Sequence, residues 1–553
     1  MDEEIDFDLE KMTSITLETA GKDRLQMLDR DDIYRSYTPF QKQMILISGA
    51  MIAMLTPFCD TIYLPALQEV AISLNTTEIL TAASVSAYLG AVGAGQLLWG
   101  PLSDYYGRNV VLFVCLAIFE GFTIACIFAP DIISLIILRT IEGFFVGCCI
   151  TSVQAVISDV FAPDVRGAAL SYFLGPMLIG PIIAPLIGGI LAEKYTWRAD
   201  FILLAIMTVP IVIFAFIVTP ETHHWYVLRK QNKAACRDSD YQDGAQKGNV
   251  TRSSTIEEVV APAEDLDITR GDMRCQDTLD KAEEGFSQEP ATNRLAEGST
   301  HNTNSNLNEN DNGSSPDPPV DNTMAENPQN RVKSEKLCDI ATPRMMMPWT
   351  VAAFIIDPEL AAYYAIEVST FACMLTSLTL LPLTLAKPPY DLAPGILGVT
   401  FLPVGAAMLV GAIVGGSLSD WSAARYPHTP HGIMIATILV SVMCPFGTVG
   451  FGFSLQNGQP LSSVLITHCI MGFGQSVIMP STLSFLSTMR PDNAGAAGSA
   501  MLFLSFLLAA GTIAVSTIIS AEIGVGYFFL IVAAICSVAT ACALSICIRK
   551  TFC

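Results

Sequence analysis

Long apolar segments alternate with short polar ones along most of this chain. A helix that spans a bilayer needs about 20 mostly apolar residues, and twelve segments have that length and character. They are 44–67, 79–99, 110–129, 132–156, 168–191 and 201–218, followed by 360–385, 393–418, 432–453, 461–483, 494–519 and 524–548. The pattern predicts an all-α membrane protein whose helices form two six-helix bundles.

Two long polar regions lie outside these segments. The N-terminal tail is acidic, and the central connector is rich in Asp, Glu, Asn, Ser and Pro. Neither can bury enough apolar area to fold alone, so we expect both to be disordered. The predicted domains are an N-terminal tail, a first bundle, a connector, a second bundle and a short C-terminal tail, at 1–43, 44–222, 223–345, 346–548 and 549–553.

The composition excludes a large soluble protein. The 553 residues are 51% hydrophobic and only 15% charged, whereas soluble domains carry about 25% charged residues. The net charge of −22 arises mainly in the tail and the connector, and no nucleic-acid partner is expected. The 15 cysteines follow no paired spacing and lie mostly in apolar segments, which favours packing over disulfides or metal ligands.

The positions of Lys and Arg predict how the chain crosses the membrane, because short cytoplasmic loops carry an excess of both. With the N-terminus inside, the short inner loops and the C-terminal tail carry Arg108, Arg166, Arg425, Arg490, Arg549 and Lys550, and the outer loops carry Lys194, Arg198 and Lys387. The bias predicts a multi-pass protein of the cell membrane, with both termini and the connector in the cytoplasm. A weak glycosylation candidate, Asn75, would lie in a short outer loop.

A motif after the second segment carries chemistry. It reads Gly-Pro-Leu-Ser-Asp-Tyr-Tyr-Gly-Arg-Asn and contains Gly100, Asp104, Gly107 and Arg108. The glycines permit a tight turn and close helix contact, and Asp104 can pair with Arg108. The sequence here resembles the major facilitator superfamily, whose signature is G-x-L-x-D-x-x-G-R-[RK]. The resemblance implies two six-helix bundles with inverted internal repeats and a gate at the cytoplasmic face.

A partial copy of this motif follows the eighth segment, at the matching position of the second half. It contains Gly416 and Asp420, and internal repeats of this kind are expected in such transporters.

Ionisable residues inside spanning helices are expensive and usually functional. Asp60, Glu120 and Arg139 each lie about eight or nine residues from the outer end of their segment, roughly 12 Å deep at 1.5 Å per residue. We therefore expect one buried titratable network at this depth. Alternatives remain open: Arg139 could extend to the interface, Asp60 could cap a helix break, and Glu120 could form a structural hydrogen bond.

Two of these residues lie in motifs that are similar to those of drug:proton antiporters with twelve spanning helices. Asp60 begins Asp-Thr-Ile-Tyr-Leu-Pro-Ala-Leu, which resembles D-x-Y-L-P-A-L. Arg139 begins Arg-Thr-Ile-Glu-Gly, which resembles R-x-x-Q-G, with Glu142 in place of glutamine. The resemblance ties Arg139 to proton coupling.

The fifth segment is rich in Gly and Pro, which permit close packing and a kink. Its sequence resembles the antiporter motif G-P-x-x-G-P-x-x-G-G, with Ala184 in place of one glycine, and this resemblance implies export. Generic small-residue packing is the alternative. The matching residues are Gly180, Pro181, Pro185, Gly188 and Gly189.

In the second half, Glu367 is the acid deepest inside a segment. We expect it to face a central cavity, although it could face another helix. The nearby rings of Tyr363, Tyr364 and Phe371 could stack on a flat or cationic substrate, or simply pack in the core.

The sequence contains no nucleotide-binding loop, metal-ligand cluster or nucleophile motif, so we expect no cofactor, no enzymatic activity and a gradient as the energy source. The resemblance implies a monomeric antiporter that exchanges protons for small molecules such as xenobiotics across the plasma membrane. A dedicated exporter of one endogenous organic acid, polyamine or secondary metabolite is the alternative. A third hypothesis is a membrane sensor that does not transport.

Overall fold

The structure of this chain is a computed structural model, and it describes residues 37–161, 163–222, 354–427, 429–490 and 494–552. The predicted connector, most of the predicted N-terminal tail and Arg166 fall on residues or side chains outside this description.

The first half contains the six predicted helices. α2 begins at Pro39, earlier than predicted, because Thr38 and Gln41 form a capping box in which each side chain accepts the other's backbone N–H. Pro65 follows α2 and lies in a single 3₁₀ turn that leads into α3. The elements are α2 Pro39–Ile62, η1 Leu64–Ala66, α3 Leu67–Ser73, α4 Glu78–Tyr106, α5 Arg108–Ile127, α6 Ile132–Val160, α7 Pro163–Lys194 and α8 Arg198–Val218.

The second half contains the other six, with two differences from the prediction. The ninth segment, expected as one helix, is divided into η2, α14 and α15; η2 leads directly into α14, and α14 and α15 meet at Val442. The C-terminal helix extends through most of the predicted tail. The elements are α12 Pro358–Leu385, α13 Pro394–Arg425, η2 Pro430–Met434, α14 Ile435–Ser441, α15 Met443–Gln456, α16 Leu461–Met489, α17 Ala494–Ile523 and α18 Val525–Phe552.

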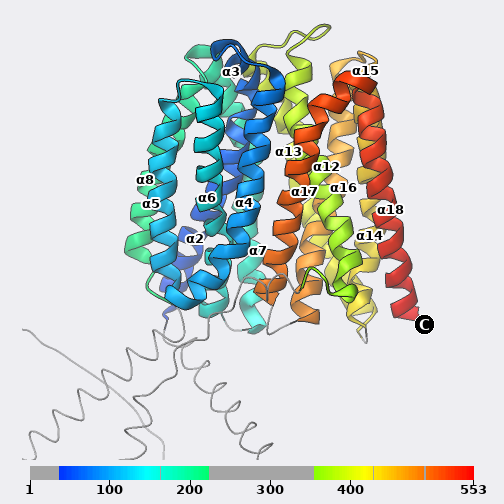
Figure 1. Cartoon of the computed structure of the whole chain (residues 1–553). Coiled ribbons are helices and arrows are strands. Elements are labelled where there is room, and N and C mark those ends of the chain that lie inside the picture. Colours follow the sequence, from blue (N-terminus) through cyan, green and yellow to red (C-terminus); the bar gives the residue numbers. More distant parts are fainter. Residues whose placement is uncertain (1–36, 162, 223–353, 428, 491–493, 553) are drawn as a thin grey trace, which may run out of the picture. The chain divides into compact units, whose positions relative to one another are not determined.

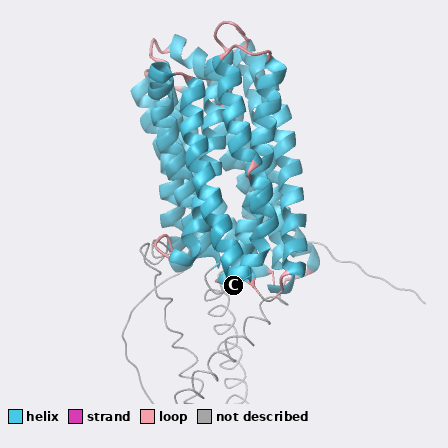
Figure 2. Cartoon of the chain, turned by 90° about the vertical axis from the view of Figure 1, so that its right-hand side faces the viewer, coloured by secondary structure: helices cyan, strands magenta, loops and turns pink. Residues whose placement is uncertain are grey.

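The described helices form two bundles that lie side by side (Figure 1). We call the end at which α2 begins and α18 ends the terminal end, and the other, where α3 lies, the distal end; they are at the bottom and top of Figure 1. Between the bundles, α4 packs against α17 and α7 packs against α13. The described regular structure is helical throughout, as Figure 2 shows.

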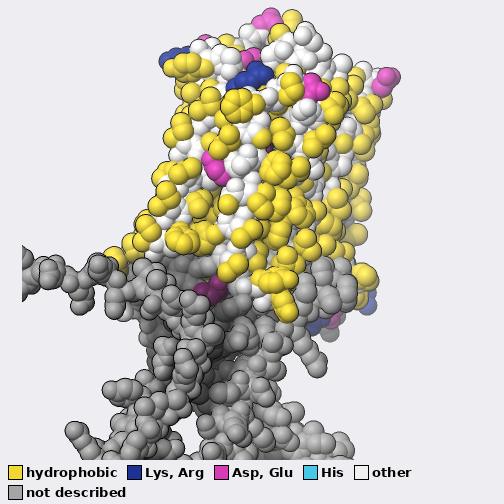
Figure 3. Space-filling model, turned by 60° about the vertical axis from the view of Figure 1, so that its left-hand side comes forward, with side chains coloured by type: hydrophobic (Ala, Val, Ile, Leu, Met, Phe, Trp, Pro, Cys, Tyr) yellow, Lys and Arg dark blue, Asp and Glu magenta, His cyan; other side chains and the backbone are white. Residues whose placement is uncertain are grey.

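The surface of the bundles suits a bilayer. Ten described helical segments are long and apolar enough to cross a membrane. The helices α4 and α7, with 29 and 32 residues, are of similar length to these ten. On the face in Figure 3, hydrophobic side chains cover most of the height and Lys and Arg lie towards the two ends. Large apolar side chains such as Phe216 and Phe446 are exposed, as lipid contact requires. The predicted all-α fold of two bundles is confirmed.

Candidate functional site

A cavity lies between the two bundles, near the middle of the helices that line it. It has a volume of about 90 Å³, and its wall comes from α2, α4, α6 and α7 of one bundle and α12, α13, α16 and α17 of the other. The wall is largely apolar, and the rings of Tyr88, Phe371 and Phe506 contribute to it. Methionines also contribute, namely Met177, Met374, Met408 and Met479. Flexible methionine side chains adapt to ligands of different shape, and such a wall with few polar groups is typical of sites for small organic molecules.

Asp60 is the charged side chain among the described residues that line this cavity. It lies in the last turn of α2, close to Pro57, whose carbonyl oxygen accepts a hydrogen bond from Thr61 Oγ1 at 2.7 Å. The side chain is 6% exposed, and within the described part of the chain no hydrogen bond or ion pair to it is formed. No capping contact to the helix break supports the capping alternative. Asp60 therefore presents a carboxylate without a partner to an apolar cavity.

Arg139 is completely buried beside this wall, and its partner is Glu142. Arg139 Nη1 lies 2.8 Å from Glu142 Oε2, one turn further along α6. The same nitrogen lies 3.1 Å from Cys59 Sγ, and Nη2 donates to the Cys59 carbonyl oxygen at 3.3 Å. The guanidinium carbon also lies 3.9 Å from the centre of the Tyr88 ring. With 0% exposure, Arg139 does not extend to the interface, and that alternative is wrong.

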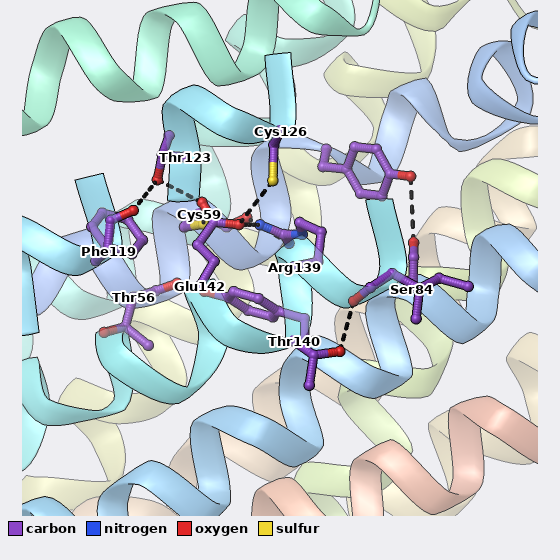
Figure 4. Close-up of polar contacts among 12 residues, drawn as sticks. Thr56, Cys59, Ser84, Phe119, Thr123, Cys126, Arg139, Thr140 and Glu142 are labelled. Atoms are coloured by element: carbon purple, nitrogen blue, oxygen red, sulfur yellow. Dashed lines mark hydrogen bonds and ion pairs between the residues drawn. The ribbon is translucent and has the colours of Figure 1, made fainter. Parts of the chain in front are cut away.

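Glu142 is fixed by a second set of contacts, which Figure 4 shows around Arg139. Thr123 Oγ1 donates to Glu142 Oε1 at 2.7 Å, and the thiols of Cys59 and Cys126 lie 3.6 Å and 3.9 Å from its two oxygens. The charge of Arg139 is thus balanced within its own helix. Neither Asp60 nor Glu120 forms an ion pair with Arg139 in the described residues. The charge of Arg139 nevertheless acts on Asp60, and that of Glu142 acts on Glu120. Arg139 touches Cys59, the neighbour of Asp60 in α2.

The other predicted acids lie apart from the cavity wall. Glu120 is half-buried, and its two carboxylate oxygens have no hydrogen-bond partner among the described residues, so the structural hydrogen bond considered for it is not observed. Glu367 is 1% exposed, and it does not line the cavity, although Phe371 one turn further does. Tyr363 OH bonds His431 Nδ1 at 2.9 Å and Tyr364 OH donates to the Ala497 carbonyl at 3.1 Å. Both tyrosines therefore pack within the second bundle.

The glycines of the predicted antiporter motif bring α7 against helices on two sides. A Cβ at Gly188 would overlap the carbonyl oxygen of Ile62 in α2, and one at Gly180 would lie 3.3 Å from the backbone nitrogen of Phe58. A Cβ at Gly189 would overlap the carbonyl oxygen of Pro394, in α13 of the other bundle. Of the two motif prolines, Pro181 lines the cavity, and the carbonyl oxygen of Pro185 faces Gly398 of α13. Only glycine permits backbones to approach this closely.

The predicted motif at Gly100–Asn109 lies at the junction of α4 and α5, because α4 extends beyond the predicted segment to Tyr106, and it forms an ion-pair cluster at the terminal end. Arg108 pairs with Asp104 in the preceding turn and with Asp159 of α6, at 3.1 Å. Gly107 has a φ of 104°, a conformation that favours glycine, whereas a Cβ at Gly100 would meet open space. The carboxylate of Glu221 accepts the N–H groups of Arg108 and Asn109, at 2.9 Å and 3.1 Å. This cluster joins α4, α5, α6 and the end of α8.

The partial copy of the motif in the second half does not form such a cluster. Asp420 is exposed and has no ion pair in the described part of the chain, and a Cβ at Gly416 would meet nothing. A different cluster joins the terminal ends of α12, α16 and α18. Arg490 contacts Asp357 at 2.9 Å and Glu359 at 3.6 Å, and Lys550 contacts Glu359 at 3.3 Å. This cluster could not be predicted from the sequence, because its members are far apart in the chain.

The family model of the Major Facilitator Superfamily matches residues 49–512. The chain belongs to this superfamily. Relatives that match most of this chain include "MFS antiporter QDR3" of Candida albicans, 25% identical over 91% of this chain and 77% of the relative. Another is "Quinidine resistance protein 3" of Saccharomyces cerevisiae, 24% identical over 90% of this chain and 81% of the relative. Among solved structures, the xylose transporter XylE from E. coli, in a partially occluded inward open conformation, is similar with a TM-score of 0.54 and 11% identity. The match covers 90% of this chain and 98% of the XylE chain. At that identity the likeness shows the fold.

The two bundles of this facilitator are joined by hydrogen bonds in the distal half. Among the described residues, these are Lys387 Nζ to Glu78 Oε2 at 2.6 Å, Gly395 N to Glu193 Oε2 at 2.9 Å, and Ser86 Oγ to the Ala510 carbonyl at 2.7 Å. Asn75 is exposed at the same end. Together with the contact of Gly189 with α13, these bonds join the two bundles at the distal end.

No group of three or more His, Cys, Asp or Glu side chains suited to a metal ion occurs in the described residues.

Proposed function

We propose that this protein is a proton-coupled antiporter that exports small, mainly apolar organic molecules, xenobiotics among them, across the plasma membrane. The family, the relatives named for antiport and quinidine resistance, and the apolar cavity support this function. The single observation that carries it is Asp60, a carboxylate without a partner on an apolar cavity wall.

Asp60 suits proton exchange because a proton and a substrate can compete for it. An ionised carboxylate in an apolar cavity attracts a cationic or hydrogen-bond-donating molecule, and a protonated one releases it. Linkage then requires the proton and the substrate to weaken each other's binding by the same factor. The four methionines and the three rings of the wall favour substrates of varied shape, which supports broad export over a dedicated metabolite exporter.

Arg139 and Glu142 act on this site by positioning the turn of α2 that carries Asp60. Their charges compensate each other, so Arg139 does not hold Asp60 permanently ionised, while its contacts with the thiol and carbonyl of Cys59 fix the turn that carries Asp60. Glu120 and Glu367 are further candidates for proton binding.

We also propose that the terminal end faces the cytoplasm. Of the described cations, Arg108, Arg425, Arg490, Arg549 and Lys550 lie at the terminal end, and Lys194, Arg198 and Lys387 lie at the distal end. The contacts between the bundles at the distal end support a state closed to the outside, and we assign the gate at the cytoplasmic face to the Arg108 and Arg490 clusters. The chain acts as a monomer in a lipid bilayer.

The test uses the full-length protein in proteoliposomes with an imposed pH gradient and a fluorescent lipophilic cation as substrate. Wild type should concentrate the dye against its gradient, and its affinity should change with pH by roughly 5- to 150-fold, the usual range of coupling. Asp60→Asn should bind the dye without pH dependence and fail to concentrate it. Asp420→Asn, which removes an exposed carboxylate without a described partner, is the matched control and should behave as wild type.

Uphill transport with normal pH dependence in the Asp60 variant would place the proton site elsewhere. Competition by chemically diverse compounds supports a multidrug exporter, whereas competition by one compound class alone supports the dedicated exporter. A sensor would show no flux in wild type.

A further inference from the structure

A second buried carboxylate without a partner lies at the distal end of the first bundle. Asp200 is in the first turn of α8 and is 0% exposed. Neither of its carboxylate oxygens has a hydrogen-bond partner among the described residues, and the same holds for Oε2 of Glu69, on α3. This acid lies outside the cavity described above.

The surroundings of Asp200 contain no available cation. Arg198, on the same helix, donates to the carbonyl oxygens of Ile127 and Ala129, both at 3.0 Å, and its guanidinium carbon lies 4.3 Å from the centre of the Trp197 ring. These contacts hold Arg198 between the end of α5 and the start of α8, and its charge acts on Glu69, which also accepts the backbone N–H of Trp197.

The titratable groups that do act on Asp200 are few. Glu69 of α3 is the charged group in the described residues whose field acts on it. From the end of α2, the phenol of Tyr63 lies nearby and donates to or accepts from Ser84 Oγ at 3.4 Å. On α5, the thiol of Cys126 contacts Glu142 Oε2 at 3.9 Å.

A fully buried anion with neither a cation nor a hydrogen-bond donor is strongly disfavoured, and a second carboxylate close by disfavours it further. A proton on the carboxyl group removes both costs. We propose that Asp200 and Glu69 form a proton-binding site at the distal end, with Asp200 holding a proton in this state.

This proposal rests on the proposed antiport and gives the site a place in it. The distal end is the outer side, from which an exporter driven by a proton gradient takes its protons. Glu69 is half-buried and reaches towards the surface, while Asp200 is enclosed. Phe201, next to Asp200, packs against Tyr63 with ring centres 5.7 Å apart, and Tyr63 lies one turn beyond Asp60 in the chain. The site thus lies between the outer surface and Asp60.

The first experiment measures thermal unfolding of the purified full chain in lipid nanodiscs, without substrate, across mildly acidic to alkaline pH. Only the protonated acid suits its surroundings, so wild type should lose stability as pH rises. Asp200→Asn mimics the neutral acid and should lose less, so that the two melting temperatures diverge by at least about 3 °C over this range. Glu69→Gln should change the pH at which wild-type stability falls. Asp131→Asn, which removes an exposed carboxylate at the same end, is the control and should follow wild type.

Parallel curves for wild type and Asp200→Asn would overturn the proposal. So would a stabilisation of wild type by Na⁺ at alkaline pH that Asp200→Asn lacks, because the site would then bind a metal cation.

The second experiment measures proton-driven transport of the dye in proteoliposomes. Asp200→Asn should bind the dye with wild-type affinity but transport it more slowly, and the deficit should be largest when the outer proton concentration is low. If wild type shows no proton-coupled transport while the melting curves still diverge, the antiport proposal fails and the proton site at Asp200 stands. If Asp200→Asn transports at the wild-type rate at every pH, its role in proton uptake is refuted.

Discussion

The contact between Gly189 and α13 makes a sharp prediction about how the distal end closes. In Gly189→Ala the added Cβ would overlap the Pro394 carbonyl oxygen and lie 3.1 Å from the backbone nitrogen of Gly398. Backbone atoms cannot rotate away as a side chain can, so α7 and α13 must separate by on the order of 1 Å to reach normal contact distances. Because these helices belong to different bundles, the substitution should open the distal end.

The magnitude follows from the cost of overpacking, about 1–3 kcal/mol. If that cost falls on the distally closed state alone, the ratio of open to closed molecules rises by roughly 5- to 150-fold, since 1.4 kcal/mol corresponds to a factor of ten.

Two other glycines supply controls. Gly188→Ala would overlap the Ile62 carbonyl oxygen inside the first bundle, so it should lower the melting temperature without changing the ratio of states. Gly511→Ala, on α17, meets nothing within 4 Å and should change neither. All three share the helix-propensity gain of about 1 kcal/mol that accompanies Gly→Ala, so this gain cancels in the comparison.

The assay is hydrogen–deuterium exchange at the N-terminus of α13, where the Gly395 N–H donates to Glu193 across the bundles. Gly189→Ala should accelerate exchange there, while Gly188→Ala and Gly511→Ala should match wild type. Equal exchange in Gly189→Ala and Gly511→Ala would refute the inference that the α7–α13 contact closes the distal end.

Three further predictions concern charged groups. Arg139→Leu or Glu142→Leu alone should destabilise the protein by about 3–5 kcal/mol, because each variant leaves one buried charge without its partner, and the double variant should cost less than either. A double-mutant cycle in thermal unfolding measures these costs, and additive costs would contradict the pairing. Asp104→Asn should slow transport more than it weakens substrate binding, because Asp104 lies in the terminal-end cluster away from the cavity; unchanged velocity at matched expression would argue against a gate. The hydrogen bond from Arg490 lowers the pKa of Asp357. The ionised carboxylate therefore stabilises the fold above the ordinary pKa of about 4, and this stability is lost as pH falls through the lowered pKa. Wild type should lose more stability than Asp357→Asn in acid titration of thermal unfolding, and coincident curves would exclude the ion pair's contribution.

The sequence predicted the helices well because length and apolar character alone decide which segments can span a bilayer. It did less well where a helix is interrupted. The ninth segment is broken at Val442, although nothing in its hydrophobic pattern distinguishes it from an unbroken helix. Hydropathy reports burial in lipid and carries no information on local backbone geometry.

The prediction of the charged site was limited in a different way. Depth along the helix axis placed Asp60, Glu120 and Arg139 at one level, but depth does not say towards which neighbour a side chain points. A better signal was available: Arg139 and Glu142 are three residues apart, and residues at that spacing share a face of a helix. Likewise, Asp420 is followed four residues later by Ala424, where the first half has Arg108 after Asp104. That difference already indicated that the partial copy could not form the same ion pair.

The distribution of buried charge links substrate choice to proton coupling. Arg139 is the Arg or Lys side chain that is fully buried in the described residues, and Glu142 already balances it. The remaining buried acids Asp60, Asp200 and Glu367 have no cationic partner within the described part of the chain. Asp60, which lines the cavity, can be neutralised by a proton or by a cationic substrate, whereas Asp200 and Glu367 do not line it and can take up protons. A transporter with a balanced arginine and an unbalanced carboxylate on its cavity wall would thus select cations and bind protons by means of the same group.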